Sequence, residues 1–90
     1  MISDILDEIT FCEKIASMSY FFTPKDVLNF INSARYEHTQ SACDENGDIT
    51  TLLKSHIDLD GREIVFYKVM KTLTGNPDCE SFETGYIFVT

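Results

Sequence analysis

Two dipeptides, Asn46–Gly47 and Asp60–Gly61, constrain the fold most because each separates two strand-like runs. Asn, Asp and Gly tolerate the positive φ that tight hairpin turns require. The run DITTLLKSHIDL lies between the two dipeptides, and REIVFYKVMKTL follows the second. A third breaker, TGNPD, precedes the closing run FETGYIFVT. The chain from Tyr36 onward is therefore predicted to form a four-stranded antiparallel meander.

A helix is predicted over residues 3–19, with Ser3 as its N-cap. Apolar residues recur there at helical spacing and predict a core stripe: Ile2, Ile5, Leu6, Ile9, Cys12 and Ala16. A second set, Phe11, Ile15 and Met18, lies on another side of the same helix. Either this helix is buried on two sides, or the second set is a self-association stripe that forms a homodimer interface.

A second helix is predicted over residues 24–35, because its start signal is complete. Thr23 is the predicted N-cap, Pro24 occupies the first helical position, and Asp26 stands where a capping box has its acid. The 90 residues leave room for one domain, spanning residues 1–90. The predicted fold is α+β, with two N-terminal helices packed on a four-stranded antiparallel sheet. Tyr67, Val69, Tyr86 and Phe88 are expected on its less covered face.

The charge balance limits the kinds of partner. Fifteen acids face seven bases, which gives a net charge of −8. Such a chain repels nucleic acid and anionic membranes, and it attracts basic surfaces. Direct phosphate binding needs a Lys/Arg footprint, yet no two bases are adjacent here. We therefore expect no direct contact with nucleic acid or membrane, and a basic protein as partner.

The cysteines and the N-terminal sequence favour a cytoplasmic protein. Cys12, Cys43 and Cys79 form an odd set without CxxC spacing, which is typical of reduced thiols. The first residues, MISDILDEI, are acidic, unlike a secretory signal or a transit peptide. No apolar run approaches the roughly 18 residues of a membrane span.

The stretch around Gly47 partly resembles a calcium loop. With Asp44 at loop position 1, Asn46 and Asp48 occupy positions 3 and 5. However, position 6 is then Ile49 instead of Gly, and position 12 is Ser55 instead of Glu. A hairpin turn explains the same residues. Since zinc-ligand spacing and catalytic motifs are also missing from the sequence, we expect no metal, no cofactor and no enzymatic activity.

The acids need a collective interpretation. Alternate turns of a meander lie at the same end of the sheet, so the acids would gather at both ends and on the first helix. The candidate partner-binding residues, which would replace DNA phosphates, are Asp4, Asp7, Glu8, Asp44, Glu45, Asp48, Asp58, Asp60, Glu63, Asp78, Glu80 and Glu83. The simpler interpretation is that the charge only keeps a small protein soluble.

In size, acidity, cytosolic character and expected fold, the chain resembles the small acidic phage proteins that mimic DNA. Among them it is most similar to the anti-restriction nuclease inhibitors of T-even phages. The resemblance covers the whole chain but rests on no diagnostic motif, so no residue role is transferred. It implies a dimeric inhibitor in the host cytoplasm that blocks a host DNA-binding enzyme, typically a modification-dependent restriction endonuclease of the McrBC type.

Three other functions stay open at this point. An immunity or antitoxin-type protein would neutralise a basic toxin through one concentrated acidic patch. A calcium-responsive protein would use the Asp44–Asp48 stretch. A small structural or assembly subunit would oligomerise through the Phe11, Ile15 and Met18 stripe or through a sheet face.

Overall fold

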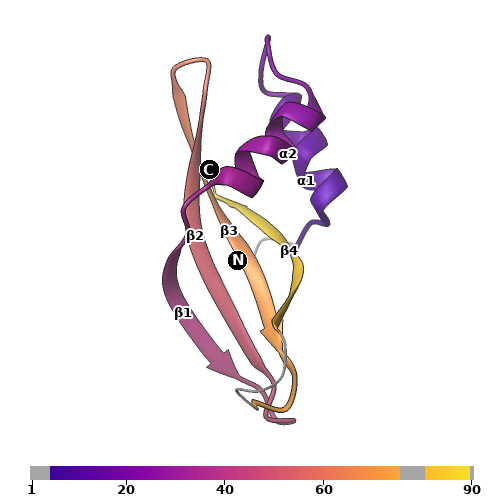
Figure 1. Ribbon diagram of the computed structural model, residues 1–90, viewed down its shortest axis with the longest axis vertical. Helices are drawn as coiled ribbons and strands as arrows, with labels where there is room; N and C mark the ends of the chain where they lie inside the picture. The colour runs from indigo at the N-terminus through magenta and orange to yellow at the C-terminus, as the bar shows by residue number, and fades with distance from the viewer. Residues whose placement is uncertain (1–4, 76–80, 90) are drawn as a thin grey trace.

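The computed structural model describes residues 5–75 and 81–89 and confirms the predicted α+β fold (Figure 1). Two helices, α1 (Glu8–Ala16) and α2 (Pro24–Ser33), precede the sheet. The strands are β1 (Glu37–Cys43), β2 (Ile49–Leu59), β3 (Arg62–Thr72) and β4 (Ser81–Val89), and a short 3-10 turn, η1 (Leu73–Gly75), follows β3. Their order in the sheet is β1-β2-β3-β4, and all pairs are antiparallel.

The hairpin of β2 and β3 forms the long axis of the molecule. Asp60 and Gly61 make its two-residue loop, with φ values of 53° and 82°. Two successive positive φ values are those of a type I′ turn, the turn that matches the twist of the strands. The register runs without interruption from Leu59 opposite Arg62 to Ile49 opposite Thr72. The hairpin predicted at Asp60–Gly61 is therefore confirmed.

Helix α2 begins as predicted. The Asp26 N–H donates to Thr23 Oγ1 at 3.3 Å, and the Thr23 N–H donates to Asp26 Oδ2 at 2.8 Å. This reciprocal pair is the capping box, and Pro24 lies inside it at the helix start. The helix ends at Ser33, two residues before the predicted end.

Helix α1 begins later than predicted. Its N-cap is Asp7, whose Oδ1 accepts the Thr10 N–H at 2.7 Å. Just before it, Leu6 pairs with Tyr86 of β4 through two backbone hydrogen bonds, both of 2.8 Å. This strand-like pairing places Leu6 in the sheet and not in a helix, so the predicted Ser3 start is wrong. Ser3 itself lies outside the described residues.

The core lies between the helices and one face of the sheet. The Phe11 ring stacks on Tyr86 at 4.9 Å between centroids and packs against Phe66 at 5.2 Å. The remaining large core residues, from both layers, are Ile15, Val27, Ile31, Ile57, Leu59 and Ile64. The helices cover the half of the sheet nearer the β2–β3 turn (Figure 1). Every residue of β1 is exposed.

The pairing of β3 with β4 corrects the expected exposed face. Phe88 lies opposite Phe66, and Tyr86 lies opposite Lys68. Directly paired residues share a face, so Tyr86 and Phe88 lie on the helix-covered side with Phe66. Tyr67 and Val69 face the other side because side chains alternate along a strand. Val69 is nevertheless only 2 % exposed, so of the four residues only Tyr67 lies on a less covered surface. Within the described residues, neither helix is long and apolar enough to cross a membrane.

Candidate functional site

The acids lie at both ends of the sheet, as the meander requires. The Asp44–Asp48 turn meets η1 at one end, where a Cβ on Gly75 would be only 2.8 Å from the Gly47 carbonyl oxygen. Asp58, Asp60 and Glu63 surround the β2–β3 turn at the opposite end. What the topology does not reveal is which carboxylates are free to meet a partner.

Asp44 organises its own turn. Its Oδ1 accepts the Asn46 N–H at 2.9 Å and the Asp48 N–H at 3.0 Å. Gly47, with φ of 81°, donates its N–H to the Asp44 carbonyl at 3.1 Å. The predicted hairpin turn is confirmed. Among residues 5–75 and 81–89, no group of three or more His, Cys, Asp or Glu side chains is placed to hold a metal ion.

Asp48 is a structural residue and not a surface acid. It is only 9 % exposed, its Oδ1 accepts the Thr74 N–H, and its Oδ2 lies 3.8 Å from Lys71 Nζ. The carboxylate thus joins the start of β2 to the end of β3 and the turn beyond it. Its prediction as a phosphate substitute is corrected, because burial and these partners keep it from another protein.

Asp60 has a similar intrachain role at the other end. Its Oδ2 accepts the Ser19 hydroxyl at 2.9 Å and the Tyr20 N–H at 3.1 Å. Beside it, the Arg62 guanidinium donates to the Met18 carbonyl. The two side chains fasten the α1–α2 loop to the β2–β3 turn. Asp60 remains exposed, but this oxygen is already occupied.

Asp58 and Glu63 are more available. They lie directly opposite each other across β2 and β3, and both are exposed. Glu63 Oε1 is 3.9 Å from Nδ1 of His56, and both side chains are about two-thirds exposed (66 % and 67 %). Like charges directly opposite on a sheet repel each other. This end of the molecule therefore retains an unfavourable carboxylate pair.

The acids of the first helix differ in role. Asp7 caps α1, and the hydrogen bonds from the Thr10 backbone and side chain lower the pKa of its carboxyl. Glu8 is half-buried beside α2. Three predicted acids, Asp4, Asp78 and Glu80, lie outside the described residues. Glu83 belongs to β4, where its backbone pairs with Met70 of β3. The Glu83 side chain is also outside what the structure describes.

Four of the seven basic side chains are held against the protein's own surface. Lys25, Arg35 and Lys54 are exposed, and Lys54 lies opposite Glu37 across β1 and β2. Lys14 Nζ lies 5.0 Å from the Phe88 ring centroid, and Lys68 Nζ lies 5.0 Å from that of Tyr36. Lys71 and Arg62 have the partners described above. Within the described ranges, four exposed acids have side chains without a hydrogen bond or ion pair to another described residue: Glu13, Glu37, Glu45 and Asp58. The sequence-based candidates omitted Glu13 and Glu37.

The predicted dimer stripe is corrected. Phe11 and Ile15 are both 0 % exposed and belong to the core of the single chain, while Met18 packs against that core from its edge. Intrachain packing already covers Phe11 and Ile15, so these two side chains are not available for a contact between two folded copies, whereas Met18 is half-buried. The interpretation that α1 is buried on two sides is only partly right, because Ile9 is 73 % exposed.

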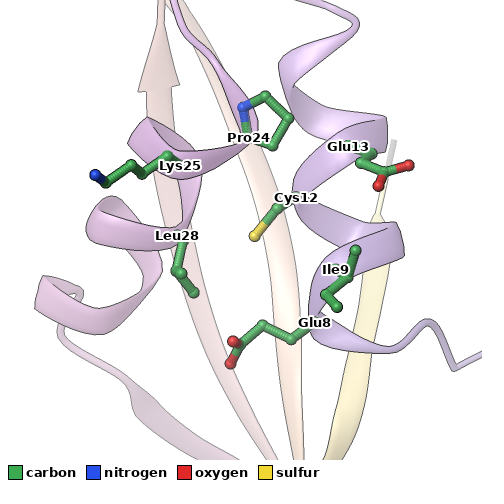
Figure 2. A pocket seen from close by; sticks show the side chains of 7 residues that line it. All are labelled: Glu8, Ile9, Cys12, Glu13, Pro24, Lys25 and Leu28. Carbon is green, nitrogen blue, oxygen red and sulfur yellow. The ribbon is translucent and has the colours of Figure 1, made fainter.

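A groove between α1 and α2 was not predicted (Figure 2). It has a volume of about 160 Å³ and is lined by Glu8, Ile9, Cys12, Glu13, Pro24, Lys25 and Leu28. Burial, together with the charge of Glu8, raises the pKa of the Cys12 thiol. Sequence periodicity placed Ile9 in the core. The buried residues of α1 cover an arc from Phe11 to Ala16, and Ile9 lies about 20° beyond the Ala16 edge of that arc.

Comparison with known proteins gives no further guide to the site. No protein-family model matches the sequence, and searches of curated proteins and of solved structures give no match.

Proposed function

We propose that the protein is a non-catalytic inhibitor that presents carboxylates in place of DNA phosphates and so blocks a basic, DNA-binding enzyme. The resemblance to acidic phage proteins suggests a modification-dependent restriction endonuclease of the McrBC type as that enzyme. The observation that carries the proposal is the contrast between acids and bases. Exposed, unpaired carboxylates occur on α1, β1, the β1–β2 turn and β2, whereas four of the seven bases are held by the chain itself.

The dimensions allow partial mimicry. The long axis measures 43 Å, and a duplex of that length carries about 25 phosphates at one charge per roughly 1.7 Å. The protein has 15 acids in all, so it offers a subset of that charge. A DNA-binding protein commonly contacts about 6–10 phosphates, which is within reach of such a subset. The expected homodimer would extend this surface, but it would need a contact other than Phe11 and Ile15.

The opposed carboxylates of Asp58 and Glu63 also support an external cationic partner. A pair that repels itself in the free protein is relieved when a Lys or Arg approaches it. If the acids served only solubility, they would not need to lie opposite each other and could be spaced apart on the surface.

The test is inhibition of a purified McrBC-type endonuclease that cleaves methylated duplex DNA. The wild-type protein should inhibit cleavage, compete with unlabelled duplex, and lose affinity as salt rises. The variant E13Q/E37Q/E45Q/D58N removes four negative charges without touching the structural acids, and we expect at least tenfold weaker inhibition. Urea unfolding of the variant controls for its stability.

Two results would count against DNA mimicry. Inhibition that survives the four substitutions, or that does not compete with DNA, would reject it. If neutralising either Glu45 or Asp58 alone removed all binding, the single-patch mode of an immunity-type protein would fit better.

A further inference from the structure

The groove between α1 and α2 is apolar at its base and open to solvent (Figure 2). Cys12, only 3 % exposed, forms its floor, and Leu28 of α2 and Ile9 of α1 form its walls. Its volume of about 160 Å³ is close to the roughly 150 Å³ of a cavity that binds a benzene-sized group. One large apolar side chain therefore fits in it.

Exposed apolar side chains also occur at the loop end of the groove. Tyr20 and Phe21 precede Pro24, which lines the groove, and they are 92 % and 79 % exposed. Their backbone is fixed, because Ser19 Oγ accepts the Phe21 and Phe22 N–H groups at 3.1 Å each. Tyr20 lines a separate hollow with Asp60 and Arg62, so these residues extend the exposed apolar surface beyond the groove. Fixed, exposed aromatic residues are typical of a protein contact surface.

The charges around the groove indicate the chemistry of its occupant. Glu8 and Glu13 belong to the α1 wall, and Lys25 is the one base among the lining residues. In Figure 2 the Glu8 carboxylate lies at the end of the groove beyond Leu28, whereas the Lys25 side chain points away from Cys12. The Glu8 end is thus open to a cation. The Glu13 side chain points away from Cys12, so Glu8 carries the charge argument. An acidic or wholly apolar segment would leave the Glu8 carboxylate uncompensated.

We propose that this groove binds a cationic amphipathic helix of the partner protein, which inserts one apolar side chain above Cys12 and places a basic residue toward Glu8. The inference rests on the proposed function in one respect, that the partner is a basic protein. The nine residues of α1 span about 13.5 Å, the length of two to three helical turns. A partner helix that packs across α1 and α2 would contact them through apolar side chains at positions i, i+3, i+4 and i+7.

The experiment titrates the full-length, 15N-labelled protein with a synthetic 16-residue peptide that has Leu at these four positions and Lys and Ala elsewhere. A peptide of identical composition in scrambled order, without an apolar face, is the control. We expect saturable shift changes in residues 8–13 and 24–28, and at least tenfold weaker binding of the scrambled peptide. Ile9→Lys should weaken binding at least tenfold. Leu73→Lys, a matched change at a 45 % exposed residue in η1, should not.

Three results would overturn the proposal: equal binding of both peptides, shift changes centred on the Asp44–Asp48 turn, or an Ile9→Lys variant that binds as wild type. Self-association of the free protein that Ile9→Lys abolishes would also overturn it, by making the groove a contact between copies. The endonuclease assay separates the two proposals. Peptide binding without inhibition refutes DNA mimicry alone, and DNA-competitive inhibition without groove binding refutes the groove alone.

Discussion

The carboxylate of Asp60 fixes the α1–α2 loop by accepting a hydrogen bond from the Ser19 hydroxyl, with 2.9 Å between the two oxygens. The same carboxylate oxygen accepts the Tyr20 N–H at 3.1 Å. Asp60 also adopts φ of 53° in the hairpin loop, a conformation that Asp and Asn tolerate better than most residues. One residue therefore shapes the β2–β3 turn and fastens the helical layer to it.

Replacement of Asp60 should separate these two roles. Asp60→Gly keeps the positive φ but removes the acceptor, so we expect the free energy of unfolding to fall by about 1–2 kcal/mol. Asp60→Asn keeps both the φ tolerance and one acceptor oxygen, so its loss should be smaller. Urea unfolding measures both variants. Equal losses would show that the Ser19 contact does not contribute.

Removal of the buried acid should be costly. Asp48→Ala leaves the Thr74 N–H without its acceptor, and we expect a loss of about 1–3 kcal/mol in the free energy of unfolding. The control is Glu45→Ala in the same turn, an exposed site where the change should stay within about 0.5 kcal/mol. Equal stability of the two variants in urea unfolding would contradict the structural role of Asp48.

A side chain at position 85 should disrupt the pairing of the N-terminal segment with β4. A Cβ on Gly85 would lie 2.5 Å from the Leu6 carbonyl oxygen, and its φ of +153° is one that other residues rarely adopt. Gly85→Ala should therefore cost about 2–3 kcal/mol. Gly61→Ala, with open space around its Cβ, should cost only the positive-φ strain of about 1–2 kcal/mol. Amide exchange at Tyr86 should accelerate only in the first variant.

Stability should decrease in acid partly through the two helix caps. Hydrogen bonds from Thr10 lower the pKa of Asp7, and hydrogen bonds from Thr23 lower that of Asp26, both from an ordinary 3.8. Because the folded pKa is the lower one, this stabilisation is complete above the ordinary value and is lost as the pH falls through the folded pKa. In unfolding measurements, the stability difference between wild type and D7N/D26N should shrink below pH 4. A difference that is constant with pH would exclude this contribution.

Relief of the carboxylate pair should stabilise the free protein while weakening partner binding. Asp58→Asn removes the repulsion with Glu63, and we expect a gain of about 0.2–1 kcal/mol in the free energy of unfolding. The same variant should inhibit the endonuclease less well. A loss of stability would contradict the repulsion between Asp58 and Glu63, and unchanged inhibition would contradict a role for Asp58 in binding.

The local features were predictable because they depend on neighbouring residues. Asn46–Gly47 and Asp60–Gly61 form their turns through backbone preferences. Thr23 and Asp26, only three residues apart in the sequence, form the capping box of α2. The start of α1 was not predictable in this way. The conformation of Leu6 is set by its pairing with Tyr86, which lies far along the chain. The helical pattern of apolar residues that extended back to Ser3 was therefore misleading.

The sequence by itself therefore determined the α+β meander, the turns and the sign of the surface charge. Only the tertiary structure decided which acids are free. Asp48 and Asp60 look no different in the sequence from Glu45 and Asp58, but a carboxylate is occupied only when another segment brings a donor within reach. Thr74 does so for Asp48, and Ser19 does so for Asp60. The exposure of Ile9 had the same origin, since α1 packs against α2 and β4 through Phe11, Cys12, Ile15 and Ala16, and this leaves Ile9 just outside the buried face.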